Sequence, residues 1–337
     1  MPRIGLQGLA CNRAIILLLR YAWLVLVSMA LTISVLLSVS IFHNQDLPHS
    51  RFMDFTVFWT AARFDGAVYD VHALTAAQLD RLPLHWTLRP FPYPPSTLLL
   101  IKPLALLPYG PALLLWTAAG IAAFAAGAMT LGRRALAAFA MLPVGLAMLA
   151  GQMSLFIGGA ISGSVGLLRR NEVAAGLLFG LAAAAKPQSV LLVPVALLAG
   201  GHWKSLAASA VALVLIALSS LCLGAHLWLD WIHAMPQFVE QTSKSPYREL
   251  NIALGPTYAP VGIVLVAVTF WRVQSASVRL LALSVGQFLC VPYMLIYDLT
   301  AACPALAALL LAPLAKLLSA ERAVREPPQL APCAPAQ

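Results

Sequence analysis

Charged side chains are scarce in this chain of 337 residues, of which Asp, Glu, Lys and Arg make up only 10%. A soluble domain is about one quarter charged and about half apolar, whereas 61% of the residues here are hydrophobic. Apolar runs long enough to cross a bilayer recur along the whole sequence. The composition excludes an ordinary soluble domain and predicts an all-α polytopic membrane protein with a single membrane-embedded domain.

Signals for metals, disulfides and nucleotides are also missing. The chain has five cysteines, but none lies in its long polar connection, so no disulfide framework is predicted. His43 and His49 are the nearest approach to a metal motif, and their placement in a loop does not favour a metal site. The GxGxxG and GxxxxGK[ST] phosphate loops do not occur, which argues against a nucleotide-binding domain and ATP-driven transport. We therefore expect neither a metal nor a cofactor.

The net charge of +9 has an explanation that needs no nucleic-acid partner. Basic residues gather in short connections, and all of these connections can lie on the cytoplasmic side if the N-terminus is cytoplasmic, as the positive-inside rule predicts. These basic residues are Arg3, Arg13, Arg20, Arg133, Arg134, Arg169, Arg170, Lys204, Arg272, Arg279, Lys316, Arg322 and Arg325.

This orientation gives about ten transmembrane spans inside a domain at residues 21–318. A cytoplasmic N-terminus (1–20) precedes the domain, and a Pro/Ala-rich tail (319–337), predicted to be disordered, follows it. The predicted spans are 21–42, 109–132, 135–150, 153–168, 173–185, 188–200, 205–223, 259–271, 280–296 and 299–315. The first span is too long for a signal peptide and favours an uncleaved anchor.

Two of the spans, 173–185 and 188–200, are short, because 13 residues of helix cover only about 20 Å. They form either a hairpin or one long helix kinked at Pro187. We favour the hairpin because it keeps Lys204 on the cytoplasmic side with the other basic residues.

With this threading, the polar residues converge on the extracytoplasmic side, chiefly in the connection 43–94. Ionisable groups in or near a bilayer are costly, so their presence indicates function. The residues gathered there are Asp54, Arg63, Arg89, Tyr93, Gln152, Lys186, Gln188 and Asp298.

Asp54 is the strongest candidate for a catalytic base. Its apolar neighbours predict partial desolvation, which raises the pKa of a carboxyl group and its basicity. An N-cap for a helix over 55–64 is an equally good and compatible interpretation. Arg63 lies nine residues later, about two and a half helical turns, and we expect it on the same face. It either pairs with Asp65 or Asp70 or contacts an anion.

The segment RPFPYPP favours a helix that begins near Ser96, because proline suits a first helical turn. The N–H groups and dipole of such a helix favour a phosphate, and Arg89 lies just upstream. A plain turn, with Tyr93 as an interface anchor, is the alternative.

The other polar residues also have two interpretations each. Lys186 either binds a phosphate or extends along the helix end to reach the interface. Gln152 contacts either a sugar hydroxyl or only its packing neighbours. Gln188 shares the predicted hairpin tip with Lys186, and Asp298 either belongs to the site or caps the last span.

Several motifs together resemble a known family. They are DFTVFW…AAR…G…VYD, RPFPYPPSTLLLIKPLALLP with Trp116, GQMSLFIGG, AAGLLFGLAAAAKPQSVLLVPVALL, HWK and YDLTAACPAL. Over roughly residues 15–315 the chain is similar to DUF2029 proteins, which are glycosyltransferase family 87. These are related to bacterial polyprenol-phosphate-mannose-dependent α-1,2-mannosyltransferases.

The resemblance implies a GT-C-like helical bundle in the bacterial inner membrane with an extracytoplasmic active site. It also implies an inverting transfer from a polyprenyl-phosphate-linked sugar to a lipid or glycan acceptor, with Asp54 as catalytic base. We expect Arg63, Arg89 and Lys186 to bind the donor phosphate. The residues expected to bind substrate are Tyr93, Gln152, Gln188 and Asp298.

Two other classes of protein are alternatives to a membrane glycosyltransferase. A transporter or flippase should show repeated halves and charges at mid-membrane, and the sequence shows neither. A non-catalytic subunit of an envelope assembly is the other alternative, since the chain is shorter than family members usually are.

Overall fold

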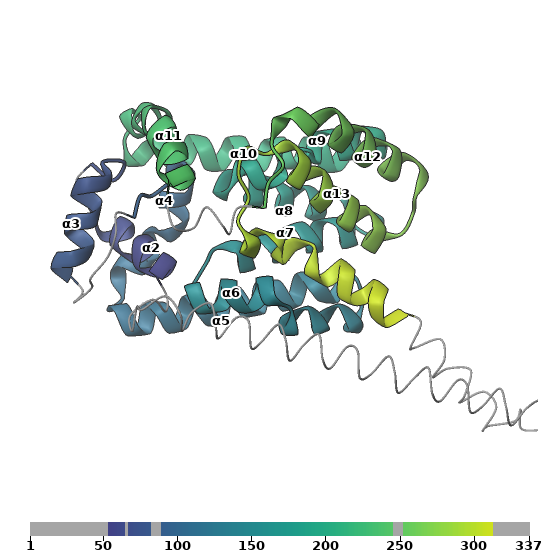
Figure 1. Ribbon diagram of the computed structural model, residues 1–337, viewed down its shortest axis with the longest axis horizontal. Helices are drawn as coiled ribbons and strands as arrows, with labels where there is room; N and C mark the ends of the chain where they lie inside the picture. The colour runs from purple at the N-terminus through teal and green to yellow at the C-terminus, as the bar shows by residue number, and fades with distance from the viewer. Residues whose placement is uncertain (1–52, 65–66, 82–88, 245–251, 313–337) are drawn as a thin grey trace, which may run out of the picture.

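The structure is a computed structural model that describes residues 53–64, 67–81, 89–244 and 252–312 (Figure 1). Every regular element within these ranges is a helix, in agreement with the predicted all-α class. The first predicted span (21–42) and both predicted terminal segments lie outside the described residues, so these predictions stay untested.

The helices follow one another in three groups along the chain. The first group is α2 (Met53–Arg63), α3 (Val71–Arg81), α4 (Pro95–Ile101) and η1 (Lys102–Leu106). The second group is α5 (Tyr109–Met129), η2 (Arg133–Ala140), α6 (Leu142–Ala150), α7 (Ser154–Leu167), α8 (Glu172–Ala185), η3 (Pro187–Val190), α9 (Val193–Ala199), α10 (Trp203–Ser220) and η4 (Leu221–Leu223). The third group is α11 (His226–Lys244), η6 (Pro256–Tyr258), α12 (Ala259–Arg272), α13 (Ala276–Cys290), η7 (Ile296–Ala301) and a last helix, Cys303–Ala312.

Two described helices are long and apolar enough to cross a membrane: α5, and α10 together with η4. Each has 21 residues, or about 31 Å at 1.5 Å per residue, which matches a hydrocarbon core about 30 Å thick. A third span results if η2 and α6, which meet at 65°, are counted together. The chain is therefore a helical membrane protein, but the predicted number of ten spans is not confirmed, because the other apolar helices in the described ranges are shorter.

Prolines divide two of the predicted spans. The span 135–150 is bent between η2 and α6, and Pro143 lies in the first turn of α6. Proline has no N–H group and its ring clashes with the preceding turn, so the upstream helix cannot run through it. The span 280–296 stops where α13 ends at Cys290, two residues before Pro292.

The segment that contains α8 and α9 reverses direction. His202 Nδ1, just after α9, lies 3.0 Å from Glu172 Oε1 at the start of α8. One continuous helix would hold these residues about 45 Å apart. The chain therefore turns back at Lys186–Pro187, as the hairpin interpretation predicts. Arg279 of α13 joins the same contact, with its guanidinium 3.2 Å from His202 Nε2.

Glycines allow the bundle helices to pack at very short range. A Cβ atom on Gly127 of α5 would lie 2.0 Å from the carbonyl oxygen of Gly159 on α7. A Cβ atom on Gly176 of α8 would lie 2.3 Å from the carbonyl oxygen of Ser205 on α10. Small residues permit this close approach of helices in membranes. Figure 1 shows α2, α3 and α11 at one end of the described structure, beyond the packed bundle.

Candidate active site

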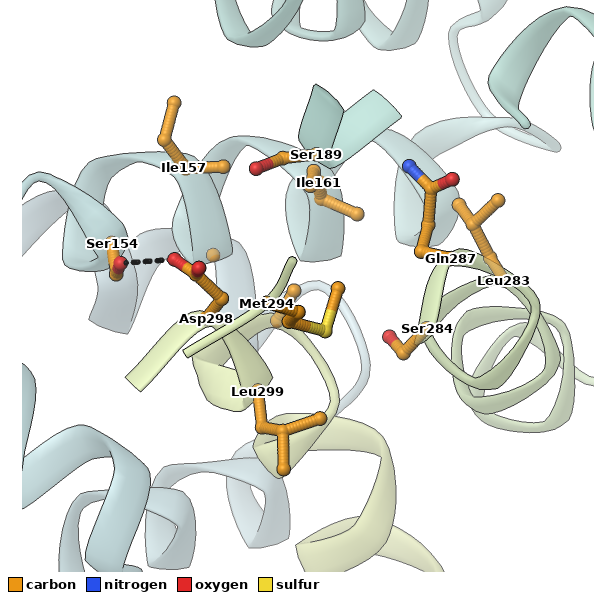
Figure 2. Close-up of a pocket in the computed structure, with 12 residues that line it drawn as sticks. Ser154, Ile157, Ile161, Ser189, Leu283, Ser284, Gln287, Met294, Asp298 and Leu299 are labelled. Carbon is orange, nitrogen blue, oxygen red and sulfur yellow. Dashed lines mark hydrogen bonds between the residues drawn. The ribbon is translucent and has the colours of Figure 1, made fainter. Parts of the chain in front are cut away.

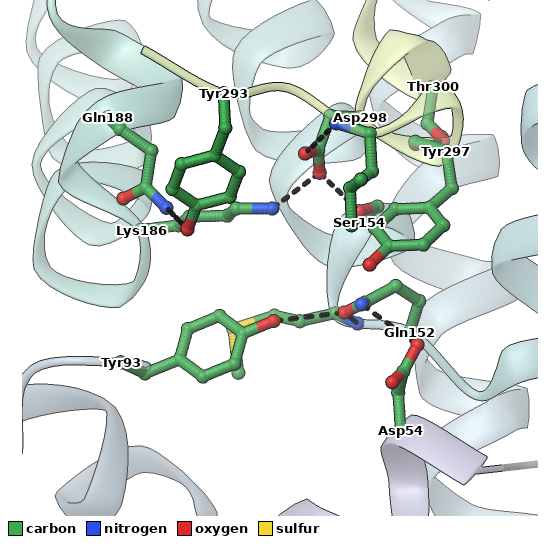
Figure 3. Close-up of polar contacts among 12 residues, drawn as sticks. Asp54, Tyr93, Gln152, Ser154, Lys186, Gln188, Tyr293, Tyr297, Asp298 and Thr300 are labelled. Atoms are coloured by element: carbon green, nitrogen blue, oxygen red, sulfur yellow. Dashed lines mark hydrogen bonds and ion pairs between the residues drawn. The ribbon is translucent and has the colours of Figure 1, made fainter. Parts of the chain in front are cut away.

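Asp54 lies at the centre of a small polar cluster. It sits in the first turn of α2, and its Oδ2 accepts a hydrogen bond from Gln152 Nε2 at 3.0 Å. An Arg89 guanidinium nitrogen lies 3.7 Å from Asp54 Oδ1. The Tyr93 hydroxyl donates to Gln152 Oε1 at 3.1 Å (Figure 3). The Asp54 side chain remains 23% exposed, so the carboxylate is accessible as well as held in place.

Gly151 determines how closely α2 approaches the turn that carries Gln152. Gly151 ends α6 with φ 65°, a left-handed conformation that glycine adopts readily. A Cβ atom on Gly151 would lie 2.7 Å from the Cβ atom of Phe55. The absent side chain is thus what lets Asp54, the neighbour of Phe55, reach Gln152.

A second cluster surrounds Lys186, which follows the last residue of α8. Its Nζ forms an ion pair with Asp298 Oδ1, and both side chains are almost fully buried. The same carboxylate accepts from Ser154 Oγ at 3.0 Å and from the Leu295 backbone N–H at 3.2 Å. The Tyr297 ring centroid lies 5.9 Å from Lys186 Nζ, which is within range of a cation–π contact.

Gln188 approaches this second cluster from the side. Its Nε2 donates to the Tyr293 hydroxyl at 3.0 Å, and in Figure 3 both residues lie beside Lys186. The hairpin tip therefore contacts the irregular segment after α13 through Gln188 and Tyr293, and it contacts η7 through Lys186 and Asp298.

The turn between α6 and α7 connects the two clusters. Gln152 contacts Asp54, while Ser154, two residues later, contacts Asp298. Figure 3 shows Asp54, Gln152 and Tyr93 on one side, opposite Lys186 and Asp298. A carboxylate and a cation, contributed by segments more than 100 residues apart in the sequence, thus face each other.

Burial is the main influence on the Asp54 carboxyl group and raises its pKa. Arg89 opposes this effect most strongly and Lys186 comes next, because both positive charges favour the carboxylate. Asp54 is consequently a stronger base than an aspartate at a protein surface. Burial also raises the pKa of Tyr93 well above its usual value, so Tyr93 keeps its proton and can donate a hydrogen bond.

Arg63 does not belong to either cluster. Its guanidinium donates to the Leu107 carbonyl at 2.7 Å and stacks over Trp59 at 4.5 Å from the ring centroid. The expectation that Arg63 shares a face with Asp54 is wrong. Two and a half turns of a helix with 3.6 residues per turn place two side chains on opposite sides.

The start of α4 has a packing role. Ser96 Oγ donates to the Ala184 carbonyl at 2.5 Å, and Thr97 Oγ1 donates to the Ala185 carbonyl at 2.8 Å. These two carbonyls belong to the last turn of α8, so the contacts hold the residues that lead directly into Lys186. The helix begins at Pro95, within one residue of the predicted start near Ser96, and it has only seven residues.

Three site residues were not predicted: Ser154, Tyr293 and Tyr297. The sequence offered a signal for two of them, because Ser154 follows Gln152 closely and Tyr297 adjoins Asp298. Tyr297 is half-buried beside Lys186. Asp298 does act as a cap, but for η7 and not for the last helix.

A small pocket lies next to Asp298, between α7 and α13 (Figure 2). Its free volume is about 20 Å³, which is room for about one water molecule. Ser154 and Asp298 form its polar end, from which mainly apolar walls extend. The other lining residues are Ile157, Gly158, Ile161, Ser189, Leu283, Ser284, Gln287, Met294, Leu299 and Ala301. A larger ligand can enter only if these walls move apart.

A carboxylate that faces a buried cation in a helical membrane scaffold has the chemistry that a group-transfer enzyme needs. Comparison with known families agrees, because the sequence model of glycosyltransferase family 87 matches residues 91–320. The chain belongs to glycosyltransferase family 87 and is a membrane glycosyltransferase. No curated protein and no solved structure matches it. Tyr93, Gln152, Lys186, Gln188 and Asp298 fall inside the matched residues, whereas Asp54 and Arg89 precede them.

Proposed function

We propose that this glycosyltransferase moves a sugar from a polyprenyl-phosphate donor to an envelope lipid or glycan, and that the sugar is mannose, as the resemblance implies. The transfer inverts the anomeric carbon and takes place at the extracytoplasmic face of the bacterial inner membrane, with residues 43–94 as part of the catalytic region. One observation carries the proposal: Asp54 and Lys186 face each other across the turn that holds Gln152 and Ser154.

Asp54 serves as the general base. The acceptor hydroxyl has a pKa far above 7, so it needs a base to remove its proton as the new bond forms. Burial has raised the pKa of Asp54 toward the working pH, which strengthens it for this task. Gln152 fixes the direction of the carboxylate, and Arg89 keeps part of the negative charge compensated.

The leaving group is the phosphate of the donor lipid. The bond from the anomeric carbon to the phosphate oxygen breaks, and its electron pair stays on that oxygen while the acceptor oxygen attacks the opposite side of the carbon. A single displacement of this kind inverts the centre. Lys186 and Arg89 stabilise the developing negative charge. These side chains supply positive charge, so the proposed reaction does not depend on a metal.

Tyr93, Gln188 and Asp298 position the substrates in this proposal. Asp298 holds Lys186 in place through their ion pair, and the protonated Tyr93 hydroxyl lies near Asp54, where a sugar hydroxyl would sit. The pocket beside Asp298 has a charged end and walls that are largely apolar, with Ser189, Ser284 and Gln287 as their polar members. Once widened, it would suit the part of a lipid stem nearest to a phosphate.

Transfer in vitro tests the proposal. Purified protein is incubated with labelled polyprenyl-phosphate mannose, glucose or arabinose and with extracted lipids, and labelled products are separated. Asp54→Asn keeps the shape of the side chain but removes the base, so we expect transfer to fall about 100- to 10,000-fold. Asp80→Asn, at an exposed carboxylate on α3, is the matched control and should retain full activity.

Two results would contradict the proposal in different ways. Full turnover by Asp54→Asn would exclude Asp54 as the base but leave the donor class standing. No transfer from any of the three donors by well-folded protein would reject the polyprenyl-phosphate donor itself.

A further inference from the structure

Helix α11 begins where a membrane-spanning helix ends. Only 11% of the α10 window is buried inside the protein, so beyond the face that packs on α8 this apolar helix is exposed. Gly224, with φ 128°, breaks the chain direction after η4. Trp228 Nε1 then donates to Ser220 Oγ at 3.1 Å, which holds the first turn of α11 against the end of α10. In Figure 1, α11 crosses the direction in which α10 runs.

One face of α11 packs on the segments that carry the candidate active site. Trp231 Nε1 donates to the Pro92 carbonyl at 3.2 Å, directly before Tyr93. The Phe238 ring lies 5.5 Å from the ring of Tyr293, centroid to centroid. Through Trp231, α11 thus contacts the segment that carries Tyr93, and through Phe238 it contacts the segment after α13.

The outward surface of α11 carries an apolar stripe. Leu229, Ile232 and Val239 are 59%, 54% and 45% exposed. They are spaced by three and seven residues, and Pro236 falls between them at helical spacing, so all four lie along one line of the helix. Large apolar side chains in a continuous exposed row indicate a surface that something covers.

A polar stripe runs directly beside the apolar one. Asp230, His233 and Gln237 are all exposed, and they follow Leu229, Ile232 and Pro236 by one position each. A step of one residue turns a helix by about 100°, so the two stripes run side by side along the helix. The surface of α11 is therefore divided three ways: toward the protein, toward an apolar medium and toward water.

We propose that α11 lies in the plane of the membrane surface, with Leu229, Ile232 and Val239 inserted at the boundary between headgroups and acyl chains. A helix with an apolar and a polar face binds membranes in this way. The occupant of the apolar stripe is lipid, because the stripe continues the lipid-facing surface of α10 from the point where that helix ends.

The chemistry of the polar stripe makes this contact unusual. Helices that lie on membranes commonly carry Lys and Arg, which attract anionic lipids. The exposed residues of the polar stripe between positions 230 and 240 are instead Asp230, His233, Gln237 and Glu240. The docking of α11 therefore depends on buried apolar area and does not require anionic lipid. Through Trp231 and Phe238 the docked helix keeps the site at the level of the lipid headgroups.

Photo-crosslinking in membranes tests the proposal without using activity as a readout. The photoreactive residue p-benzoylphenylalanine replaces Leu229 or Val239 on the apolar stripe, or Gln237 on the polar stripe, in the full chain. Each variant is reconstituted in vesicles of alkyne-tagged phosphatidylcholine, with and without phosphatidylglycerol, and irradiated. We expect lipid adducts several-fold more abundant at 229 and 239 than at 237, and equally abundant in both kinds of vesicle.

Three outcomes would overturn the proposal. Lipid adducts of equal abundance on both stripes would show that α11 does not lie at a boundary. A protein–protein adduct at position 229 or 239, at twice the mass of the chain, would assign the apolar stripe to a second copy. Adducts found only with phosphatidylglycerol would make charge, and not apolar area, the cause of docking. Two apolar positions are used so that a variant that folds poorly does not decide the result.

Discussion

The buried ion pair between Lys186 and Asp298 gives the sharpest quantitative prediction. Lys186→Met removes the cation and leaves an almost fully buried carboxylate, since the two side chains are only 6% and 8% exposed. Breaking such a pair from one side destabilises a protein by about 3–5 kcal/mol. Asp298 keeps its hydrogen bonds from Ser154 and Leu295, so we expect a loss near the lower end, about 3 kcal/mol.

Removing both charges should reverse most of this loss. In Lys186→Met/Asp298→Asn no uncompensated charge is buried, and the Asn side chain can still accept from Ser154. The double variant should therefore recover about 2 kcal/mol relative to Lys186→Met, within the range of coupling energies between contacting residues. It should nevertheless stay inactive, because the cation that stabilises the donor phosphate is missing.

The assay is a double-mutant cycle on purified protein, with reversible unfolding in mixed detergent followed by tryptophan fluorescence. Lys204→Met is the control, because Lys204 is exposed at the start of α10 and its loss should change stability by no more than about 0.5 kcal/mol. The reasoning is refuted if Lys186→Met is no more destabilising than Lys204→Met, or if the losses of the two single variants simply add. Wild-type transfer by the double variant would refute the phosphate-binding role alone.

Four further predictions concern Asp54, its neighbour Gly151 and the orientation of the chain in the membrane. Burial raises the pKa of Asp54, and the base must be ionised to act. We therefore expect kcat/KM to decrease as the pH is lowered, with a midpoint at a higher pH than an ordinary aspartate would give. The Asp54→Asn variant should not show this decrease. The raised pKa also means that ionised Asp54 is destabilising at neutral pH, so the Asn variant should unfold at the same or a higher temperature. Gly151→Ala should destabilise by at least about 1–2 kcal/mol through its left-handed backbone and lower transfer by displacing Phe55, whereas Gly110→Ala, with no atom within 4 Å of the added Cβ, should do neither. A reporter fused after Gly66 should be active only outside the cytoplasm, and cytoplasmic activity there would contradict the proposed orientation.

Sequence patterns predicted the class of protein and several site residues for clear physical reasons. Hydrophobic content alone identifies a helical membrane protein, since few charges can be tolerated in a bilayer. The Lys186–Pro187 step indicates a reversal, because proline interrupts the preceding helix. Polar residues that are rare in such a chain have few other roles, which is why Asp54, Gln152 and Asp298 could be selected before any contact was known.

Other features depend on three-dimensional contacts that a sequence pattern does not contain. Arg63 was misplaced because its position around the helix axis, and not its distance along the chain, decides whether it meets Asp54. Tyr293 is an ordinary residue in apolar surroundings, and only the approach of Gln188 at the hairpin tip gives it a partner. The predicted number of spans was not confirmed because short apolar helices, such as α9, satisfy a hydropathy pattern without the length to cross a bilayer.

The polar contact at the far end of α8 limits which parts of the enzyme can move. His202 uses both ring nitrogens, toward Glu172 and toward Arg279, and a neutral ring with its proton on Nδ1 satisfies both partners. These contacts anchor the open end of the α8–α9 hairpin to α13. We therefore expect the hairpin that carries Lys186 to keep its position relative to α13. Asp298, the partner of Lys186, lies in the short helix η7, which is outside this anchored hairpin. We therefore expect adjustment to a substrate to displace η7 relative to Lys186 more than it displaces the hairpin.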